Sequence, residues 1–514
     1  MKLNYKRTIL VGFAFFLILA FWQAYDTIVP LILTNKFGMS QFWSGAIMAL
    51  DNILALFMLP LFGTLSDKHK GKSGRRTPFI RFGTIAAVIL LVALTFADAA
   101  QLKQINAVSV VDDPAALELI YDTQADRELV RPNKTKATLQ EEKFVLSDEI
   151  TREDFVAIRS TVEKGGKEIA NPDYVNYVVP ARQAYVWQIT SQSPQPLIMF
   201  VGILLLLLVA MATFRSPAVA LMPDVTIKPL RSKANAIINL MGYVGGIFVM
   251  VLGMIFATGA EKNFMMSYTG YFCAVAGLML VALIVFLCTV REPKWVADMH
   301  AESVRLGLSE EEDAPEAGIK RKLTGGEKRS LLLVLASVVL WYFGYNAISS
   351  KYSVYATNIL SKDFNLTLTI GTAAAIISFV PVGILSSKIG RKKAILIGVA
   401  LLAAAFCAAI FVGPNSSDIL IYAIFILAGM AWATINVNSF PMVVEMCSDG
   451  DVGKYTGYYY TASMAAQTLT PMLSGFMMDK LGMGILFPYA AIFVAGSFVT
   501  MLFVKHGDAK PEAA

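Results

Sequence analysis

The sequence predicts an all-α membrane protein that crosses the bilayer twelve times, as two similar halves of six helices each. The first observation is composition: 56% of the 514 residues are hydrophobic and only 16% are charged, which is too apolar for a soluble protein of this length. The second is a series of twelve apolar stretches, each close to the roughly 20 residues that cross the hydrocarbon core. The third is a basic motif that follows an apolar stretch in both halves.

The expected spans follow one another with short connections, apart from one long polar interval. The first begins like a signal peptide, but its apolar run continues past Asp26 to Leu33 and contains Trp22 and Tyr25 in place of a small-residue cleavage site. We therefore interpret it as a helix of the mature protein. In order, the spans are expected at residues 8–34, 42–66, 79–99, 196–217, 234–258, 265–290, 330–350, 368–387, 393–412, 418–441, 455–478 and 484–504.

Lys and Arg concentrate in alternate connections, which predicts a multi-pass protein of the cell membrane with both termini in the cytoplasm. The formal net charge of +6 is then a topology signal and requires no nucleic-acid partner. The four cysteines fall in expected spans or at their inner ends, so no disulfide framework is expected.

The basic motif occupies Gly63 to Pro78, with the sequence GTLSDKHKGKSGRRTP, and is expected to form a tight cytoplasmic hinge. A second copy runs from Pro381 to Lys393 as PVGILSSKIGRKK, in which a serine replaces the acid at Asp67. A repeated hinge is expected of a membrane protein that is built from two similar halves.

The interval from about residue 100 to 195 is polar and acidic, and the topology places it outside the cell. Thr151 resembles the start of a capping box for a short helix that Gly165-Gly166 would end, and Tyr174 to Val179 alternates like a strand. The two hinge glycines, Gly63 and Gly383, are 320 positions apart, whereas the acids Asp224, which follows the interval in the first half, and Glu445, its match in the second half, are 221 apart. The difference between the two spacings, 320 minus 221 or 99, is close to the length of the polar interval. We therefore expect an insertion that forms a small folded domain, with a structureless loop as the alternative.

The chain is accordingly divided into six regions. They are 1–99 (helices one to three), 100–195 (the extracytoplasmic insert), 196–291 (helices four to six), 292–328 (a solvated cytoplasmic linker), 329–505 (helices seven to twelve) and 506–514 (a cytoplasmic tail).

The hinge resembles the loop between the second and third helices of the major facilitator superfamily, and its lengthened spacer is most similar to the melibiose-type and sucrose-type cation symporters. Ser216 to Arg231, SPAVALMPDVTIKPLR, resembles the P-x-x-A-L-x-P-[DE]-[LV]-T pattern between helices four and five of the glycoside-pentoside-hexuronide:cation symporters. The resemblance covers the spans but not the insert. It implies a secondary transporter of sugars or glycosides driven by a proton or sodium gradient.

Two acids, Asp26 and Asp51, lie well inside expected spans, where a charged group costs about 2.5 to 3.5 kcal/mol on insertion scales and is seldom without a role. Trp22 and Tyr25 lie near Asp26 on its helix, so an aromatic wall beside a carboxylate is expected to bind a sugar. A structural hydrogen bond to a neighbouring helix is the alternative for Asp26. Asn52, which follows Asp51, is expected to face the same interior.

Melibiose-type relatives carry two acids one helical turn apart before the hinge, but here those positions are Ala55 and Leu59. This difference argues against a sodium site of that type. A carboxyl group withdrawn from water retains its proton more readily, so we favour the proton as the coupling cation. Arg215 is expected either to pair with one of the two acids or to extend toward the interface.

The remaining candidates for the cavity are polar or aromatic groups on later spans, each of which could equally be an interface hydrogen bond or an interfacial aromatic. They are Asn239, Tyr345, Asn346, Trp432 and Asn436.

Charges at the hinges are candidates for a conformational latch, because an acid at a helix end that faces a base on a neighbouring loop biases the opening of the inner mouth. The expected pairs are Asp67 with Arg75 or Arg76, Asp224 with Arg231, and Glu445 with Lys454, although pairs across loops are possible, and Gly63, Gly383 and Arg391 complete the two hinges. The alternative is that these charges serve topology alone.

An enzyme is not expected, because no phosphate-binding loop, metal motif or histidine-activated nucleophile is present in the sequence. No cofactor is expected, and the protein should act as a monomer on a small solute and a coupling cation. Three rivals remain: an exporter, a carrier of lipids or other solutes on the same fold, and a receptor that acts through its outer domain.

Overall fold

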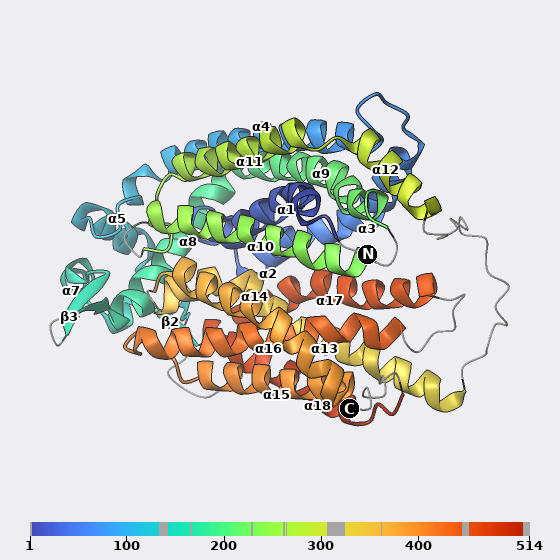
Figure 1. The fold of residues 1–514 in the computed structure, drawn as a ribbon. Helices are drawn as coiled ribbons and strands as arrows, with labels where there is room; N and C mark the ends of the chain where they lie inside the picture. Colours follow the sequence, from blue (N-terminus) through green and yellow to red (C-terminus); the bar gives the residue numbers. More distant parts are fainter. Residues whose placement is uncertain are drawn as a thin grey trace.

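Two bundles of long helices lie side by side, and a smaller polar segment covers one end of them (Figure 1). The computed structural model describes residues 3–132, 142–164, 167–227, 230–260, 263, 265–305, 324–360, 362–444 and 452–506. We call the end that carries the polar segment the segment face, and the opposite end, where both chain ends lie, the terminus face.

The N-terminal bundle forms the upper layer of Figure 1. Its helices are mostly apolar and pack around α1, whose interior face is buried from Val11 to Leu31. The elements are α1 (Tyr5–Leu31), η1 (Ile32–Lys36), α2 (Gln41–Met48), α3 (Leu50–Lys68), α4 (Thr77–Gln104), α9 (Gln195–Asp224), α10 (Arg231–Ile255), α11 (Thr269–Thr289) and α12 (Glu292–Arg305).

The C-terminal bundle forms the lower layer, and its central helix is α13, which is buried at Val334, Val338 and Trp341. One hydrophobic core runs through both bundles. The elements are α13 (Gly325–Tyr355), η6 (Ala356–Leu360), α14 (Phe364–Ile389), α15 (Arg391–Ala409), α16 (Asp418–Val444), α17 (Val452–Leu481), η7 (Met483–Ile485) and α18 (Leu486–Leu502).

The expected all-α polytopic membrane class is confirmed. Within the described residues, 10 helices are long and apolar enough to cross a membrane. The span expected at 368–387 lies in α14, whose apolar described part is the shorter Phe364–Phe379, and the span expected at 455–478 lies in α17.

The two bundles repeat one irregular feature at the segment face. Helix α1 continues into the five-residue π-helix η1, and α13 continues into the five-residue π-helix η6. In α1 the irregularity follows Pro30, which has no N–H to donate to the carbonyl of Asp26 four residues earlier. The backbone is therefore loosened one turn from a candidate site residue, and π-turns of this kind are frequent at functional sites.

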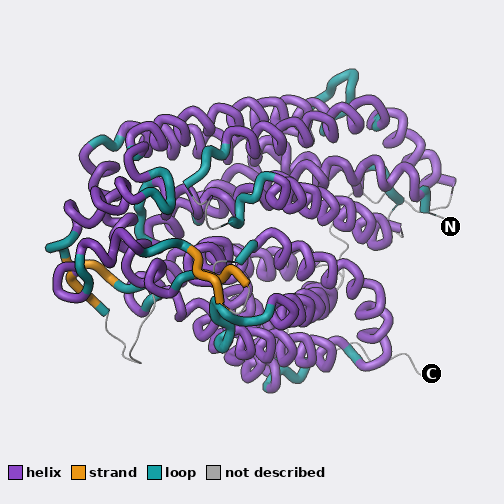
Figure 2. Tube along the Cα trace, turned by 90° about the vertical axis from the view of Figure 1, so that its left-hand side faces the viewer, coloured by secondary structure: helices purple, strands orange, loops and turns teal. Residues whose placement is uncertain are grey.

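The polar segment, residues 105–192, folds over its own hydrophobic core, which includes Leu117, Phe144, Phe155 and Tyr174. Figure 2 shows its short strands, which form two antiparallel pairs, β1 with β2 and β3 with β4. Its elements are η2 (Asn106–Val108), α5 (Pro114–Gln124), β1 (Glu128–Val130), β2 (Lys143–Val145), α6 (Leu146–Glu149), α7 (Arg152–Ala157), β3 (Thr161–Lys164), β4 (Lys167–Ala170), η3 (Tyr174–Val178) and α8 (Val179–Gln192).

Two local predictions for this segment are corrected by the structure. Thr151 caps a helix as expected, but that helix, α7, ends at Ala157, and the chain on either side of Gly165-Gly166 forms the strands β3 and β4. A two-residue glycine pair between strands is typical of a hairpin, a signal that outweighs helix termination here. Tyr174 to Val179 is helical rather than extended, because its aromatic and branched side chains pack into the segment's core.

Lys36, which the topology places in an outer loop, is fully buried. Its ammonium group pairs with Asp98 of α4 and lies 4.5 Å from the centre of the Tyr268 ring. Asp98 also accepts a hydrogen bond of 3.1 Å from the backbone of Tyr268. The buried Lys36 is therefore paired with a buried acid, Asp98, which lies at the end of the span expected at 79–99.

Arg182 is expected to be the main polar support of the segment. It is 1% exposed and donates to three backbone carbonyls, those of Val108 at 2.6 Å, Val110 at 3.3 Å and Val111 at 2.6 Å. Arg182→Met should leave these carbonyls unpaired and destabilise the segment by about 2 to 3 kcal/mol. Hydrogen exchange of residues 105–124 measures the loss.

Arg159→Met provides the matched control, because Arg159 is exposed and donates only to neighbouring carbonyls among its described hydrogen bonds. Its exchange should stay close to that of the wild type. Equal protection of residues 105–124 in both variants would show that Arg182 does not support the segment.

Candidate functional site

Three charged side chains from three helices lie near enough to interact electrostatically in the N-terminal bundle. Asp26 comes from α1, Asp51 from the first turn of α3 and Arg215 from α9. Both carboxylates interact electrostatically with Arg215 and with one another. Two negative charges and one positive charge leave one negative charge, which one proton or one monovalent cation would neutralise.

Asp51 occupies this position because the second span is broken at its beginning. Helix α2 ends at Met48 and α3 begins at Leu50, so Asp51 lies in the first turn of a new helix, where the helix dipole favours a carboxylate. Asn52 donates a hydrogen bond of 2.8 Å to the same carboxylate. Asn52 therefore contacts the carboxylate of the residue that precedes it.

Trp22 lies beside the charged cluster. The guanidinium carbon of Arg215 is 5.2 Å from the centre of the Trp22 ring, within cation–π range. The Trp22 indole nitrogen is buried and has no hydrogen-bond partner in the described part of the chain. A buried donor of this kind is costly unless a ligand or water satisfies it, so Trp22 offers both a ring face and a free N–H to a solute.

Tyr25 lies beside Trp22 and near both acids. It is 2% exposed, and its hydroxyl donates to the carbonyl of Met48 at 3.3 Å, at the break between α2 and α3. Its ring packs edge-on against Trp22, with 5.3 Å between ring centres. Tyr25 also interacts electrostatically with Asp51 and Asp26, so it belongs to the surroundings of the cluster.

The C-terminal bundle contributes an aromatic wall. Tyr345 of α13 stacks on Trp432 of α16 with ring centres 3.6 Å apart and an angle of 1° between the planes. Tyr345 also interacts electrostatically with Asp26, so this wall faces the charged cluster across the two bundles. The side-chain nitrogen of Asn346 is buried without a hydrogen-bond partner in the described residues.

The remaining two candidates hydrogen-bond within their own helices. Asn436 donates to the carbonyl of Trp432 at 3.2 Å, which places it next to the aromatic wall. Asn239 donates to the carbonyl of Asn235 at 2.8 Å on α10. Asn436 is therefore adjacent to the site, whereas the described contacts of Asn239 do not reach the charged cluster.

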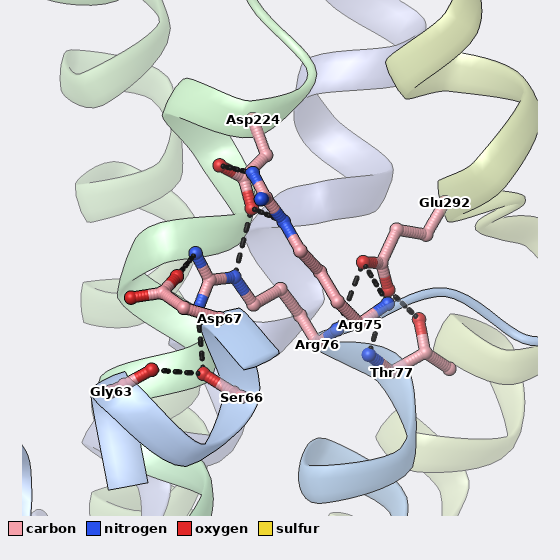
Figure 3. Close-up of polar contacts among 8 residues, drawn as sticks. All are labelled: Gly63, Ser66, Asp67, Arg75, Arg76, Thr77, Asp224 and Glu292. Carbon is pink, nitrogen blue, oxygen red and sulfur yellow. Dashed lines mark hydrogen bonds and ion pairs between the residues drawn. The ribbon is translucent and has the colours of Figure 1, made fainter. Parts of the chain in front are cut away.

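A second group of charges lies at the terminus face, and we call it the terminus network (Figure 3). Arg75 contacts Asp224 through two nitrogens, at 2.7 and 3.2 Å, and Arg76 contacts the same acid at 2.8 Å. Arg76 also pairs with Asp67 and donates to the hydroxyl of Ser66 at 2.5 Å. Although burial lowers the pKa of Arg76, its hydrogen bonds and charge interactions with Asp224 and Asp67 raise that pKa above its ordinary value.

Glu292 completes the terminus network and was not found from the sequence, which placed it in a solvated linker. It is 1% exposed and accepts hydrogen bonds from the backbone N–H groups of Arg75, Arg76 and Thr77 at 2.7 to 2.9 Å. The Thr77 hydroxyl donates to it as well, at 2.7 Å. Glu292 therefore caps the N-terminus of α4 from the start of α12. The sequence feature that could have pointed to Glu292 is its position directly after the apolar span expected at 265–290.

The sequence paired Asp224 with Arg231, but the structure pairs Asp224 with Arg75 and Arg76, across two connections. The side chains of Arg231 and Lys454 lie outside the described part of the structure, as does Glu445. Every described member of the terminus network belongs to the N-terminal bundle. The network therefore braces α3, α4, α9 and α12 against one another.

The two hinges share one local contact. The Ser66 hydroxyl donates to the carbonyl of Gly63 at 2.8 Å, and the Ser386 hydroxyl donates to the carbonyl of Gly383 at 3.1 Å. Their surroundings differ, because a Cβ at Gly63 would meet the Ser216 hydroxyl, whereas one at Gly383 would meet open space. Arg391 is the first residue of α15.

At the segment face, hydrogen bonds join the two bundles directly. The carboxylate of Asp479 on α17 accepts from the backbone N–H groups of Gln41 and Phe42, each at 2.7 Å. The ammonium group of Lys351 on α13 donates to the carbonyl of Gln41 at 2.8 Å, and Asn358 donates to Asn35 at 3.1 Å. None of these contacts was expected, since Lys351 was placed in an outer loop. They hold this end of the two bundles closed.

Replacing Glu292 tests the cap of α4. Glu292→Gln should lower the free energy of unfolding by about 3 kcal/mol, because an amide nitrogen would face N–H groups that now donate to a buried carboxylate. Thermal unfolding of the purified protein measures the change. Glu302→Gln, an exposed acid on the same helix, is the control and should stay within about 0.5 kcal/mol of the wild type. Equal melting temperatures for both variants would contradict the role of Glu292.

Replacing Lys351 tests the closed segment face. Lys351→Met should weaken the closed state and increase the labelling of a cysteine at Ser349 by a membrane-impermeant maleimide roughly tenfold, equivalent to about 1.4 kcal/mol. The control is Lys362→Met, since Lys362 pairs with Asp418 at 2.6 Å within the C-terminal bundle, where an exposed pair contributes little. An equal increase in both variants would rule out a specific role for Lys351.

Comparisons with known proteins agree with this architecture. Residues 10–106 match the family profile described as MFS/sugar transport protein, and residues 333–514 match the profile described as Major Facilitator Superfamily. No curated protein sequence matches the chain significantly.

Solved structures share the fold at low sequence identity. The inward-open xylose transporter XylE from E. coli is 14% identical with a TM-score of 0.57, and the alignment covers 99% of this chain and 98% of that one. A D-xylose-proton symporter is 13% identical with a TM-score of 0.56 over 98% and 99% of the two chains. A bacterial homologue of the iron transporter ferroportin, in an inward-facing state, is 12% identical with a TM-score of 0.56 over 98% and 99%. With both profiles and the shared fold, the chain is a membrane transporter of the major facilitator superfamily.

Proposed function

We propose that this transporter is a symporter that couples the movement of a sugar or glycoside to a proton gradient by alternating access. The observation that carries the proposal is the cluster of Asp26, Asp51 and Arg215, which faces the aromatic wall of the other bundle. The sugar-transport profile covers both acids of this cluster, because it spans residues 10–106. The resemblance to glycoside-pentoside-hexuronide:cation symporters supports the same substrate class.

The charges suit a proton carrier. Arg215 can neutralise one carboxylate at a time, so the other alternates between ionised and protonated states as the cavity is exposed to either side. We assign the coupling proton to Asp26. Pro30 cannot donate a backbone hydrogen bond to the carbonyl of Asp26, so the helix backbone of α1 is less constrained next to this residue. A sodium site of the melibiose type lacks its acids here, since Ala55 and Leu59 occupy those positions.

The surrounding groups suit a carbohydrate. A sugar presents an apolar ring face that packs on an aromatic side chain and hydroxyl groups that hydrogen-bond to carboxylates and N–H groups. Trp22 and Asn346 supply buried N–H groups without partners in the described residues, and Trp432 with Tyr345 supplies the aromatic surface. We propose that the sugar binds between the bundles at these groups.

Alternating access then requires the segment face to open. The hydrogen bonds that Asp479 and Lys351 make to Gln41 must break in that step, whereas the terminus network keeps the N-terminal bundle rigid as it moves. We further propose that the protein acts as a monomer in the cell membrane, with both termini in the cytoplasm and residues 100–195 outside as an insert between helices three and four of a twelve-helix chain.

Asp26→Asn in proteoliposomes tests the proposal. With an imposed pH gradient, wild-type protein should accumulate at least one of a panel of labelled sugars and glycosides, and Asp26→Asn should reduce accumulation at least about tenfold because an amide cannot carry the proton. Exchange of the same sugar without a gradient should persist, which separates coupling from binding.

Asp298→Asn is the control, since Asp298 pairs with Arg7 at 2.8 Å on the surface of the terminus face. It should accumulate sugar like the wild type. The proposal fails if no sugar or glycoside shows gradient-dependent uptake, or if Asp26→Asn accumulates sugar as well as the control does.

A further inference from the structure

We propose that the preferred substrates are glycosides with an apolar, planar aglycone, and that the aglycone occupies a pocket in the C-terminal bundle. This inference rests on the proposed function and extends it from the sugar to the group attached to the sugar. The pocket is formed by one face each of α13, α14 and α16, with the residues of each face spaced by three or four positions. The three faces are represented by Tyr345 and Ile348 on α13, Gly371 and Ala375 on α14, and Ala428 and Trp432 on α16.

The lining of the pocket is apolar. Its walls include the aromatic rings of Phe425 on α16, Phe406 on α15 and Phe487 on α18, which are 8%, 2% and 2% exposed. Ser349 is one of its few polar residues, and the Ser349 hydroxyl donates to the carbonyl of Asn346 at 3.2 Å. A bare monosaccharide would find little hydrogen bonding here, whereas an aryl group would be removed from water against several rings.

The room in the pocket comes from small residues at the crossing of α14 and α16. A Cβ at Gly429 would overlap the backbone oxygen of Gly371, so the two helices are in backbone contact there. Ala375 and Ala428 continue this small-residue surface along the pocket. Larger side chains at these positions would fill the space without altering the charged cluster in the other bundle.

The pocket shares two lining residues with the proposed sugar site. Tyr345 and Trp432, whose rings stack at 3.6 Å, line the pocket and also form the aromatic wall opposite Asp26. A polar end in the N-terminal bundle and an apolar end in the C-terminal bundle therefore share one wall. An elongated molecule with a sugar at one end and an apolar ring at the other matches this arrangement.

Competition for uptake tests the inference. Wild-type proteoliposomes that transport a labelled sugar should be inhibited at least about tenfold more strongly by its phenyl glycoside than by its methyl glycoside, because a phenyl group buried in the pocket leaves water. Ala428→Phe should fill the pocket and abolish this preference while it leaves inhibition by the methyl glycoside unchanged. Ala375→Leu gives the same test with a smaller side chain, should Ala428→Phe fold poorly.

Ala423→Phe is the matched control, because Ala423 lies on the same helix with an exposed side chain. It should retain the preference for the phenyl glycoside. The inference is overturned if wild-type protein transports sugars with no such preference, or if the pocket variants keep the preference, as they would if lipid chains occupied the pocket. Either result leaves the symporter proposal standing, whereas the absence of gradient-driven uptake of any sugar overturns both.

Discussion

A helix that begins inside a protein leaves several backbone N–H groups without partners, and two such helix starts determine how this transporter is held together. At the terminus face, Glu292 accepts from the N–H group of Thr77, the first residue of α4, and from those of the two residues before it, and it joins α12 to the N-terminal bundle. At the segment face, Asp479 accepts from the first N–H groups of α2 and joins the two bundles. The first acid stabilises one bundle, and the second stabilises the closed contact between the two bundles.

The distinction follows from which parts each acid connects. Glu292 and the helix that it caps lie in one bundle, so their hydrogen bonds persist when the bundles move. Asp479 and α2 lie in different bundles, so their hydrogen bonds exist only while the segment face is closed. Gly45 and Gly475 extend the closed contact, because neither has room for a Cβ against the backbone of the opposite bundle. Opening this face therefore exchanges buried backbone contacts for contacts with water or solute.

Much of the fold could be predicted from the sequence, because hydropathy and the repeated hinge report directly on helices and on two related halves. Asp26, Asp51 and Trp22 could be identified for a similar reason, since polar groups inside apolar stretches are conspicuous. Glu292, Lys351 and Asp479 could not, because each lies near the end of a span, where charges are ordinary. Their roles depend on which helix start lies opposite them. Packing within the N-terminal bundle determines this for Glu292, and the docking of the two bundles determines it for Lys351 and Asp479.

Three groups of charges differ in a way that bears on the proposed coupling. Lys36 and Asp98 form a balanced pair. The terminus network joins Arg75 and Arg76 to Asp67, Asp224 and Glu292 within one bundle and is partly open to water. Arg215 with two carboxylates has one acid in excess, and this cluster faces the other bundle. Because withdrawing an uncompensated charge from water is costly, the empty cluster with both acids ionised resists enclosure. Protonation removes that excess charge, so the proposed cluster would favour movement of the loaded carrier over movement of the empty, deprotonated one.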